Sequence, residues 1–435
     1  MKTMLWVVVA LLPAAAGTDN LRFGGYVENG TSVMLADEES ISDAASVRLE
    51  GDWDFGKRGA IETHVLLSAA LQPLDPSIAF RRNSFLADIM DELEQGLMAE
   101  AADVLGREPV DTTEVDSAQL REQARLQRKR RKQVDRFLTY LPYTSFYPVD
   151  RVLLDRALLK LYFEGADLYI GRQTIAWGTG YAFNPTDIWN RKNPLDPTAP
   201  KVGVNALRAE IPLGMLSGIS LVLTPGPDFD HTSGGMRLKG NLGGFDLSIS
   251  GMRIMNADRE LLELPEKWAI GADMAGQIGD VGVWTEAAVN NPVYDGMSYT
   301  DLDSLYVQAD AGADYTFEWG TYVMLEYYYN GPGRGDPDDY GVRDLLYVFT
   351  GETAGFGRHY LMAGTRHTFG NYYRVSGFVL GNISDRSAML LPSIAYDFSD
   401  NMTIELSSQI GIGDKKRTEF GAVFGNLMLT VTGYF

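Results

Sequence analysis

A two-residue alternation of apolar and polar side chains recurs through most of this 435-residue chain and constrains its fold more than any other feature. From Ser46 to Phe55, Leu49 and Trp53 share one face of an extended strand, whereas Arg48 lies on the other with the remaining polar side chains. A helix repeats every 3.6 residues and cannot produce this pattern. The sequence therefore predicts an all-β protein whose strands have one face suited to hydrocarbon and one suited to water. The same alternation recurs at residues 156–164 and 305–317.

The segments between the predicted strands alternate between short turns and long loops. Short turns such as 165–167 and 278–280 are followed or preceded by longer connections such as 255–266 and 291–303. A soluble β-sandwich has no need of this alternation. A membrane barrel does need it, because its periplasmic turns are tight and its extracellular loops are long.

Counting on this basis gives 18 strands, so the predicted fold is a transmembrane antiparallel up-and-down β-barrel. An even number of strands returns both chain ends to the periplasm. A barrel of 16 strands remains possible, because residues 387–398 are apolar on both faces and contain Pro392, and because the last strand is unusually long. The predicted strands are 20–30, 44–55, 59–71, 151–164, 167–177, 204–213, 218–224, 233–241, 244–254, 267–277, 280–290, 304–317, 320–330, 357–368, 371–381, 387–398, 401–412 and 418–435.

The N-terminus has the features of a secretory signal peptide. Lys2 gives a positive start, residues 4–12 are apolar, and three alanines follow at 14–16. We expect residues 1–16 to be removed and residues 17–435 to form a single barrel. After this leader no run of about 18 apolar residues occurs, which excludes a membrane-spanning helix.

The C-terminus ends in a strand whose apolar face finishes at a phenylalanine. Leu427, Leu429, Val431 and Phe435 share this face, and the pattern resembles the terminal strand by which outer-membrane proteins are recognised for barrel insertion. We therefore expect the barrel-insertion machinery and outer-membrane lipid as partners, and the bacterial outer membrane as the location. Aromatic residues that would form interfacial girdles collect near strand ends at Trp53, Phe55, Trp268, Phe317, Trp319, Tyr327, Tyr329, Phe369, Tyr372 and Phe398.

Composition excludes several classes of function. A formal net charge of −20 argues against a nucleic acid partner, which needs clustered cations. The absence of cysteine excludes disulfides, thiolate metal sites and iron–sulfur ligation. The chain contains no nucleophile elbow and no phosphate-binding glycine loop. We expect no catalytic residues, no metal and no cofactor, and hence a protein that is not an enzyme. Metal-ligand spacing is absent among the four histidines His64, His231, His359 and His367.

One long insertion, residues 73–150, interrupts the strand pattern between the third and fourth predicted strands. Apolar residues at helical spacing predict an amphipathic helix at 82–106, and a second helix at 117–138 carries a basic patch at 121–136. One interpretation is a solvated charged face. The other is that the insertion folds over or into the barrel as a cap or plug, with its cations meeting lumenal carboxylates or an anionic ligand.

Strand alternation also predicts which charges face the lumen, because a charge facing lipid at mid-membrane depth costs several kcal/mol. A basic wall and an acidic wall would set up a transverse field that orients dipolar solutes. Alternatively, the two sets pair into a rigid network across a filled interior. The predicted basic set is Arg156, Lys160, Arg172, Arg208, Arg237 and Lys239, and the acidic set is Asp273, Glu286, Asp310, Asp314 and Glu326.

Four short motifs carry a family resemblance: Gly-Arg-Gln-Thr-Ile-Ala-Trp-Gly at 171–178, Asn-Pro-Thr-Asp at 184–187, Asn-Pro-Leu-Asp-Pro at 193–197 and Gly-Val-Asn-Ala-Leu-Arg at 203–208. In these residues the chain resembles a group of porin-like outer-membrane proteins, whose relatives include large barrels implicated in polysaccharide export or capsule assembly. The resemblance covers about 45 residues. It implies an outer-membrane channel or scaffold without defining a substrate.

The same motifs predict an ordered loop. Asn-Pro and Asp-Pro pairs fix successive turns, so residues 178–203 are expected to be ordered and to be able to fold inward. Four aromatic residues lie in this loop or directly before it. They either form a surface on which sugars stack or simply pack the loop: Trp177, Tyr181, Phe183 and Trp189.

These observations lead to one expected function and two rivals. The expected function is the passage of small polar or charged solutes through the barrel. The rivals are a plugged barrel that serves polysaccharide export or attachment, and a sheath for a separate partner such as a periplasmic electron carrier.

Overall fold

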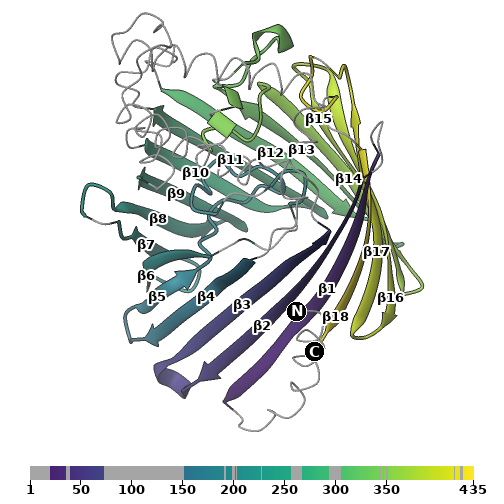
Figure 1. The fold of residues 1–435 in the computed structure, drawn as a ribbon. Coiled ribbons are helices and arrows are strands. Elements are labelled where there is room, and N and C mark those ends of the chain that lie inside the picture. The colour runs from purple at the N-terminus through teal and green to yellow at the C-terminus, as the bar shows by residue number, and fades with distance from the viewer. Residues whose placement is uncertain are drawn as a thin grey trace, which may run out of the picture.

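The protein is a closed barrel of 18 antiparallel strands. In the computed structural model, each strand pairs with its neighbours in sequence, and β1 pairs with both β2 and β18, which closes the sheet (Figure 1). The predicted signal peptide and the predicted helical insertion lie outside the residues that the structure describes. The described residues are 20–35, 40–72, 151–190, 193–197, 201, 203–226, 228–255, 267–292, 305–341, 344–345, 347–348, 351–415, 417–421 and 425–435.

The predicted strand number of 18 is confirmed, and each predicted range overlaps the strand found at its place. The strands are β1 (Leu21–Leu35), β2 (Ser40–Asp54), β3 (Gly59–Gln72), β4 (Arg151–Tyr162), β5 (Asp167–Gln173), β6 (Val204–Pro212), β7 (Gly218–Thr224), β8 (Ser233–Leu242), β9 (Phe245–Ile254), β10 (Lys267–Ile278), β11 (Val281–Pro292), β12 (Tyr306–Thr316), β13 (Tyr322–Asn330), β14 (His359–Phe369), β15 (Tyr373–Asn382), β16 (Ser387–Ser399), β17 (Met402–Ile412) and β18 (Gly425–Tyr434).

Four strand ends differ from the sequence prediction by four residues or more. β1 runs to Leu35 instead of residue 30, and β2 begins at Ser40 instead of residue 44. β5 stops at Gln173 instead of residue 177, because the chain turns away from the sheet there. The last strand begins at Gly425 instead of residue 418, and residues 418–421 belong to the loop before it. Pro392 does not interrupt β16: it pairs with Gly377 of β15, and the register with β17 omits its position, as expected for a residue without a backbone N–H.

The strands alternate between an apolar outer face and a polar inner face. On β10, Trp268 and Ile270 are exposed on the outside, whereas Lys267, Ala269 and Asp273 are buried on the inside. In a soluble protein such a band of exposed apolar side chains would be unfavourable, but in a bilayer it replaces water contacts by lipid contacts. Among the described residues, no helix is both long and apolar enough to cross a membrane.

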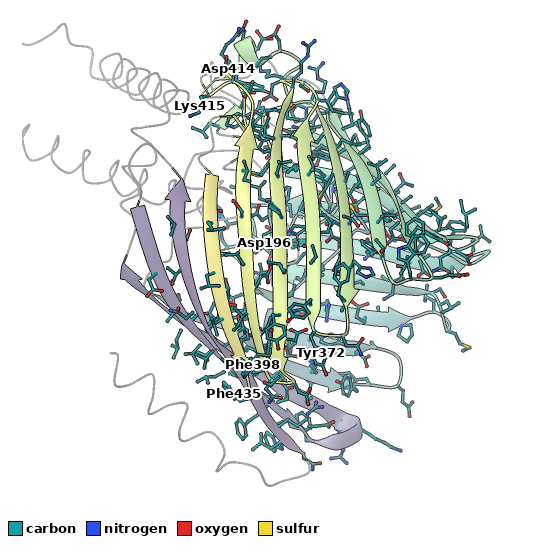
Figure 2. All side chains as sticks on the ribbon, turned by 90° about the vertical axis from the view of Figure 1, so that its right-hand side faces the viewer. Asp196, Tyr372, Phe398, Asp414, Lys415 and Phe435 are labelled. Atoms are coloured by element: carbon teal, nitrogen blue, oxygen red, sulfur yellow. The ribbon has the colours of Figure 1, made fainter. Side chains whose placement is uncertain are left out.

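The two ends of the barrel differ in chemistry. Tyr372, Phe398 and Phe435 lie near the end that carries the short turns, and Asp414 and Lys415 lie at the opposite end, on a loop (Figure 2). The chain terminus is tied into the barrel, since the Gly25 and Phe435 backbones exchange two hydrogen bonds of 3.1 Å.

Two apolar cores lie in the barrel interior within the part of the chain that the structure describes. Inward-facing side chains of β13–β16 form the first with loop residues, and those of β6, β7, β9 and β10 form the second with residues that follow β5. Water therefore does not fill the whole lumen, because large parts of the inner wall are covered by chain that has left the sheet. The buried members are Ala182, Phe183, Leu195, Met324, Tyr328, Tyr360, Met362, Leu380, Met389 and Phe420 in the first core, and Ile175, Trp177, Ala206, Val222, Met252 and Ala269 in the second.

Candidate constriction in the lumen

Residues 174–203, called here the lumenal segment, leave the wall after β5 and fold into the barrel. The structure describes 174–190, 193–197, 201 and 203 of this segment. Asp196, in its second half, lies between the two ends of the barrel in Figure 2. The segment that the sequence predicts to be ordered is therefore placed inside the lumen, where it narrows the passage.

Short-range hydrogen bonds give the segment a defined shape. The Asp187 amide donates to the Asn184 carbonyl over 3.1 Å, which closes the Asn-Pro-Thr-Asp turn. The Ile175 amide donates to Asn190 Oδ1 over 2.7 Å. Asp187 is fully buried and forms an ion pair with Lys201. Burial raises the pKa of the Asp187 carboxyl to about 6, an effect that the Lys201 ammonium offsets only in part.

Glu286 of β11 holds the first half of the segment. Its buried carboxylate accepts hydrogen bonds from the Thr179 amide at 2.8 Å, the Thr186 amide at 2.5 Å and the Thr186 hydroxyl at 2.7 Å. The segment therefore supplies donors that water would supply in an open lumen.

Glu326 of β13 holds the next residues in the same way. Its oxygens accept from three successive backbone amides, those of Tyr181 at 2.5 Å, Ala182 at 2.8 Å and Phe183 at 2.9 Å. The indole N–H of Trp284 adds a fourth bond of 2.8 Å. Hydrogen bonds to a charged acceptor are each worth roughly 1.5–3 kcal/mol, so the two carboxylates together fix the segment against one side of the barrel.

Gly178 shows how closely the backbone approaches this wall. Its φ is +93°, and a Cβ there would lie 2.4 Å from Glu286 Oε2. A side chain would therefore meet both a strained backbone conformation and the carboxylate that anchors the segment. The Trp-Gly motif at 177–178 is explained by this contact.

Trp177 and Trp189 pack together against the second apolar core. Their rings meet edge to face with centroids 6.4 Å apart. Trp177 is buried beside Val222 and Met252, and Trp189 packs at the margin of the same core. These contacts match the packing role that the sequence left open for the two tryptophans.

Tyr181 and Phe183 lie against a different part of the wall. Phe183 is buried and stacks on Tyr328 of β13 with centroids 4.3 Å apart, and Tyr181 stacks on Phe378 of β15 at 5.8 Å. The four aromatic residues thus belong to two separate clusters and do not share one surface.

Two further loops cover the inner wall on the extracellular side. Glu352 of the 331–358 loop forms a buried ion pair with Lys267 at 2.8 Å. Glu419 of the 413–424 loop accepts from the Tyr360 hydroxyl at 2.6 Å and from Asn382 Nδ2 at 2.8 Å. Both loops are therefore tied to β10 and β14–β15 by buried carboxylates.

Most of the predicted basic residues lie on the inner face, each beside a carboxylate. Lys160 Nζ is 2.6 Å from Glu62, and Arg237 is 2.8 Å from Asp273. Glu210 lies near two of the cations, 3.8 Å from Arg208 and 3.7 Å from Lys239. Arg156 lies 3.9 Å from Glu62. The predicted basic wall is consequently interleaved with carboxylates of the same or neighbouring strands.

Arg172 is placed differently from the prediction. Its cross-strand partners are Ala157 and Asn205, in the row that Leu168 and Ile170 begin on the outer face of β5. Tyr169 and Gln173 occupy the inner row instead. The sequence prediction used the charge of Arg172 as a marker of the inner face. Strand register decides the face, however, and the register places Arg172 in the outer row.

The predicted acidic residues do lie on the inner face of β10–β13. Asp273, Glu286 and Asp310 are directly opposite one another across three strands, and each is buried. Asp314 accepts a hydrogen bond of 3.1 Å from the Tyr322 hydroxyl. Arg237 offsets Asp273, and segment amides satisfy Glu286 and Glu326. Of the two alternatives from the sequence, these contacts favour local pairing over two opposed charged walls.

Sequence reasoning missed a polar cluster on β2–β4. Arg48 contacts Glu50 at 2.6 Å and Asp155 at 2.9 Å. Asp155 faces inward together with Arg156 because a β-bulge opposite His64 inserts one residue. The alternation at 46–55 already marked Arg48 and Glu50 as polar-face residues, but nothing local signals the bulge.

The comparisons with known proteins agree with this architecture. Acinetobacter baumannii OccAB3 aligns with 96% of this chain and 100% of its own, at 8% identity and a TM-score of 0.51. The Salmonella typhi OmpF complex with daunomycin aligns over 96% and 98% at 9% identity and 0.42, and a Vibrio cholerae outer-membrane protein, the OmpT loop L8 deletion mutant, over 95% and 99% at 8% and 0.40. The chain has a porin-like outer-membrane β-barrel fold.

No family model and no curated protein matches this porin-like barrel. Its likeness to OccAB3 concerns the fold. A closed 18-stranded barrel with an apolar outer face is stable in the bacterial outer membrane, which is therefore the location of the chain. Within the ranges that the structure describes, no group of three or more histidine and carboxylate side chains is arranged to hold a metal ion.

Proposed function

We propose that this barrel is a channel for small polar or charged solutes, and that the lumenal segment sets the size of its passage. The observation that carries the proposal is the attachment of the segment to Glu286 and Glu326. Charged anchors fix a narrow point inside a barrel whose inner face carries many polar side chains beside its two apolar cores. A segment anchored in this way leaves less cross-section for solutes than the barrel wall encloses.

Planar-bilayer conductance of the purified protein tests this proposal. We expect discrete, stable steps of small conductance, because the anchored segment leaves a fixed narrow passage. Liposome swelling with sugars of increasing size provides a second measure, in which uptake should end at small solutes. Folded protein that gives neither conductance nor uptake would exclude the channel.

Silence in both assays would favour the rivals, a plugged scaffold for polysaccharide export or a sheath for an electron carrier. Deleting residues 76–146 then tests whether the insertion blocks the passage. If the insertion acts as a plug, the deletion should raise conductance several-fold. Unchanged conductance would favour the other interpretation of the insertion, a solvated charged face.

A further inference from the structure

The water-accessible part of the lumen is displaced to one side. On β10–β13, inward side chains such as Lys267, Glu286, Gln308 and Glu326 are buried beneath the lumenal segment and the extracellular loops. On β17, β18 and β1–β3, most inward side chains remain partly exposed. Solutes that cross the barrel therefore pass along the opposite wall. Among the described residues, this wall is formed by β17, β18 and β1–β4, with β6 at its margin.

Carboxylates outnumber cations on this wall. Each cation contacts at least one carboxylate: Arg48 contacts Glu50 and Asp155, and Lys160 contacts Glu62. The net charge of this wall is therefore negative. The cations are Arg22, Arg48, Arg156, Lys160 and Arg208, and the carboxylates are Glu28, Glu50, Asp52, Glu62, Asp155, Glu210 and Glu405.

Glu28 and Glu405 are the carboxylates of this wall without an ion pair among the described residues. They lie on β1 and β17, on either side of β18, where they face Thr432 and Thr430 in the strand register. The Thr432 hydroxyl donates to Glu28 over 3.3 Å, which shows that these side chains share the lumenal face. Glu405, and Asp196 of the lumenal segment, both lie close enough to Glu28 for their charges to interact with it.

We infer that the passage is cation-selective and that Glu28 and Glu405 determine this selectivity. The inference rests on the proposed channel function and names the class of solute that the channel favours. Two unpaired carboxylates beside a narrow aqueous path raise the local concentration of cations and lower that of anions. The effect is screened by salt, since the Debye length falls from about 10 Å at 0.1 M to about 3 Å at 1 M.

Reversal potentials across a bilayer with a KCl gradient test the inference on the full mature chain. We expect K⁺ to permeate more readily than Cl⁻, with a larger ratio in dilute than in concentrated salt. The double variant Glu28→Gln/Glu405→Gln should lower the permeability ratio by roughly two-fold or more. Charge reversal in Glu28→Lys should lower it further.

A matched control is Glu318→Gln, which removes the same charge from an exposed periplasmic turn and should leave the ratio unchanged. The heat-dependent mobility shift of folded barrels verifies that each variant is assembled. A conducting wild-type channel without cation preference, or one whose preference survives in the double variant, would overturn this inference alone. Absence of any conductance would instead overturn the proposed function.

Discussion

The amide of Phe183 donates a 2.9 Å hydrogen bond to Glu326 Oε1, across 143 positions of sequence. The ring of the same residue stacks on Tyr328, two positions along β13. One strand therefore holds the backbone of the lumenal segment through a carboxylate and its side chain through an aromatic face. Such a double attachment makes the constriction a fixed element of the barrel.

Replacing Glu326 by Gln should loosen this attachment. A neutral amide accepts fewer and weaker hydrogen bonds and turns an N–H₂ group toward the segment amides, at a cost of about 1–3 kcal/mol for the buried donors left unsatisfied. We expect larger and noisier conductance in single-channel records. Glu318→Gln, which removes the same charge from an exposed turn away from the segment, should keep the wild-type conductance. An unchanged Glu326→Gln channel would show that the carboxylate is dispensable.

Gly178→Ala should displace the segment by a steric route. The new methyl group would lie 2.4 Å from Glu286 Oε2, on a backbone with φ of +93° that costs an alanine roughly 1–3 kcal/mol. We expect lower resistance of the segment to limited proteolysis and a higher conductance. Gly335→Ala is the matched control, because its Cβ would meet open space. Equal proteolysis of both variants would count against the close approach.

Lys267→Met should destabilise the extracellular side of the barrel. The ammonium is buried, 2.8 Å from Glu352 and 2.8 Å from the Tyr306 hydroxyl. Removing one partner of a buried ion pair typically costs about 3–5 kcal/mol. A double-mutant cycle with Glu352→Gln, measured by urea unfolding in detergent, should give a coupling energy well above zero. Additive single effects would mean that the pair is not energetically coupled.

Asp187 predicts a pH dependence of stability. Its pKa in the folded protein, about 6, lies above the ordinary value of 3.8, because burial disfavours the charged form. The folded state therefore binds the proton more tightly than the unfolded chain does. This contribution is complete below about pH 3.8 and is lost as the pH rises through 6. Relative to Asp187→Asn, the free energy of unfolding of the wild type should fall between pH 4 and 7. A rise over that interval would contradict the assignment.

Removing Lys201 sharpens the same test. The Lys201 ammonium lowers the pKa of Asp187, so Lys201→Met should move the fall in stability to higher pH. The size of the shift reports how strongly the buried pair is coupled. A shift to lower pH would require a different partner for the carboxylate.

Much of the barrel follows from residues close together in sequence. The alternation of Leu49 and Trp53 with Arg48 already defines a strand and its two faces, because side chains of an extended chain point alternately to either side. The same logic placed ten of the eleven predicted charges on the inner face, although it left out lumenal charges such as Arg48 and Glu28. It went wrong at Arg172, where a charged residue lies in the outward row that register assigns to it.

The candidate site was only partly accessible to such reasoning. Glu286 and Glu326 were recognised as lumenal, but not as anchors for backbone amides a hundred or more residues away. The aromatic residues of the lumenal segment were identified, yet their division between two cores depends on which wall each one reaches. That Glu28 and Glu405 lie near each other is visible only in the closed barrel, where β18 pairs with both of their strands.

The sequence by itself determined the strand type, the polarity of each face and a strand number of 18 or 16, since these depend on a local two-residue period and on short turns; the closed sheet decided for 18. The tertiary structure alone decided the bulge at Asp155, the entry of residues 174–203 into the barrel and the choice of their anchors. The physical reason is that these features arise when distant groups compete for buried hydrogen bonds, and such a competition leaves no periodic signal along the chain.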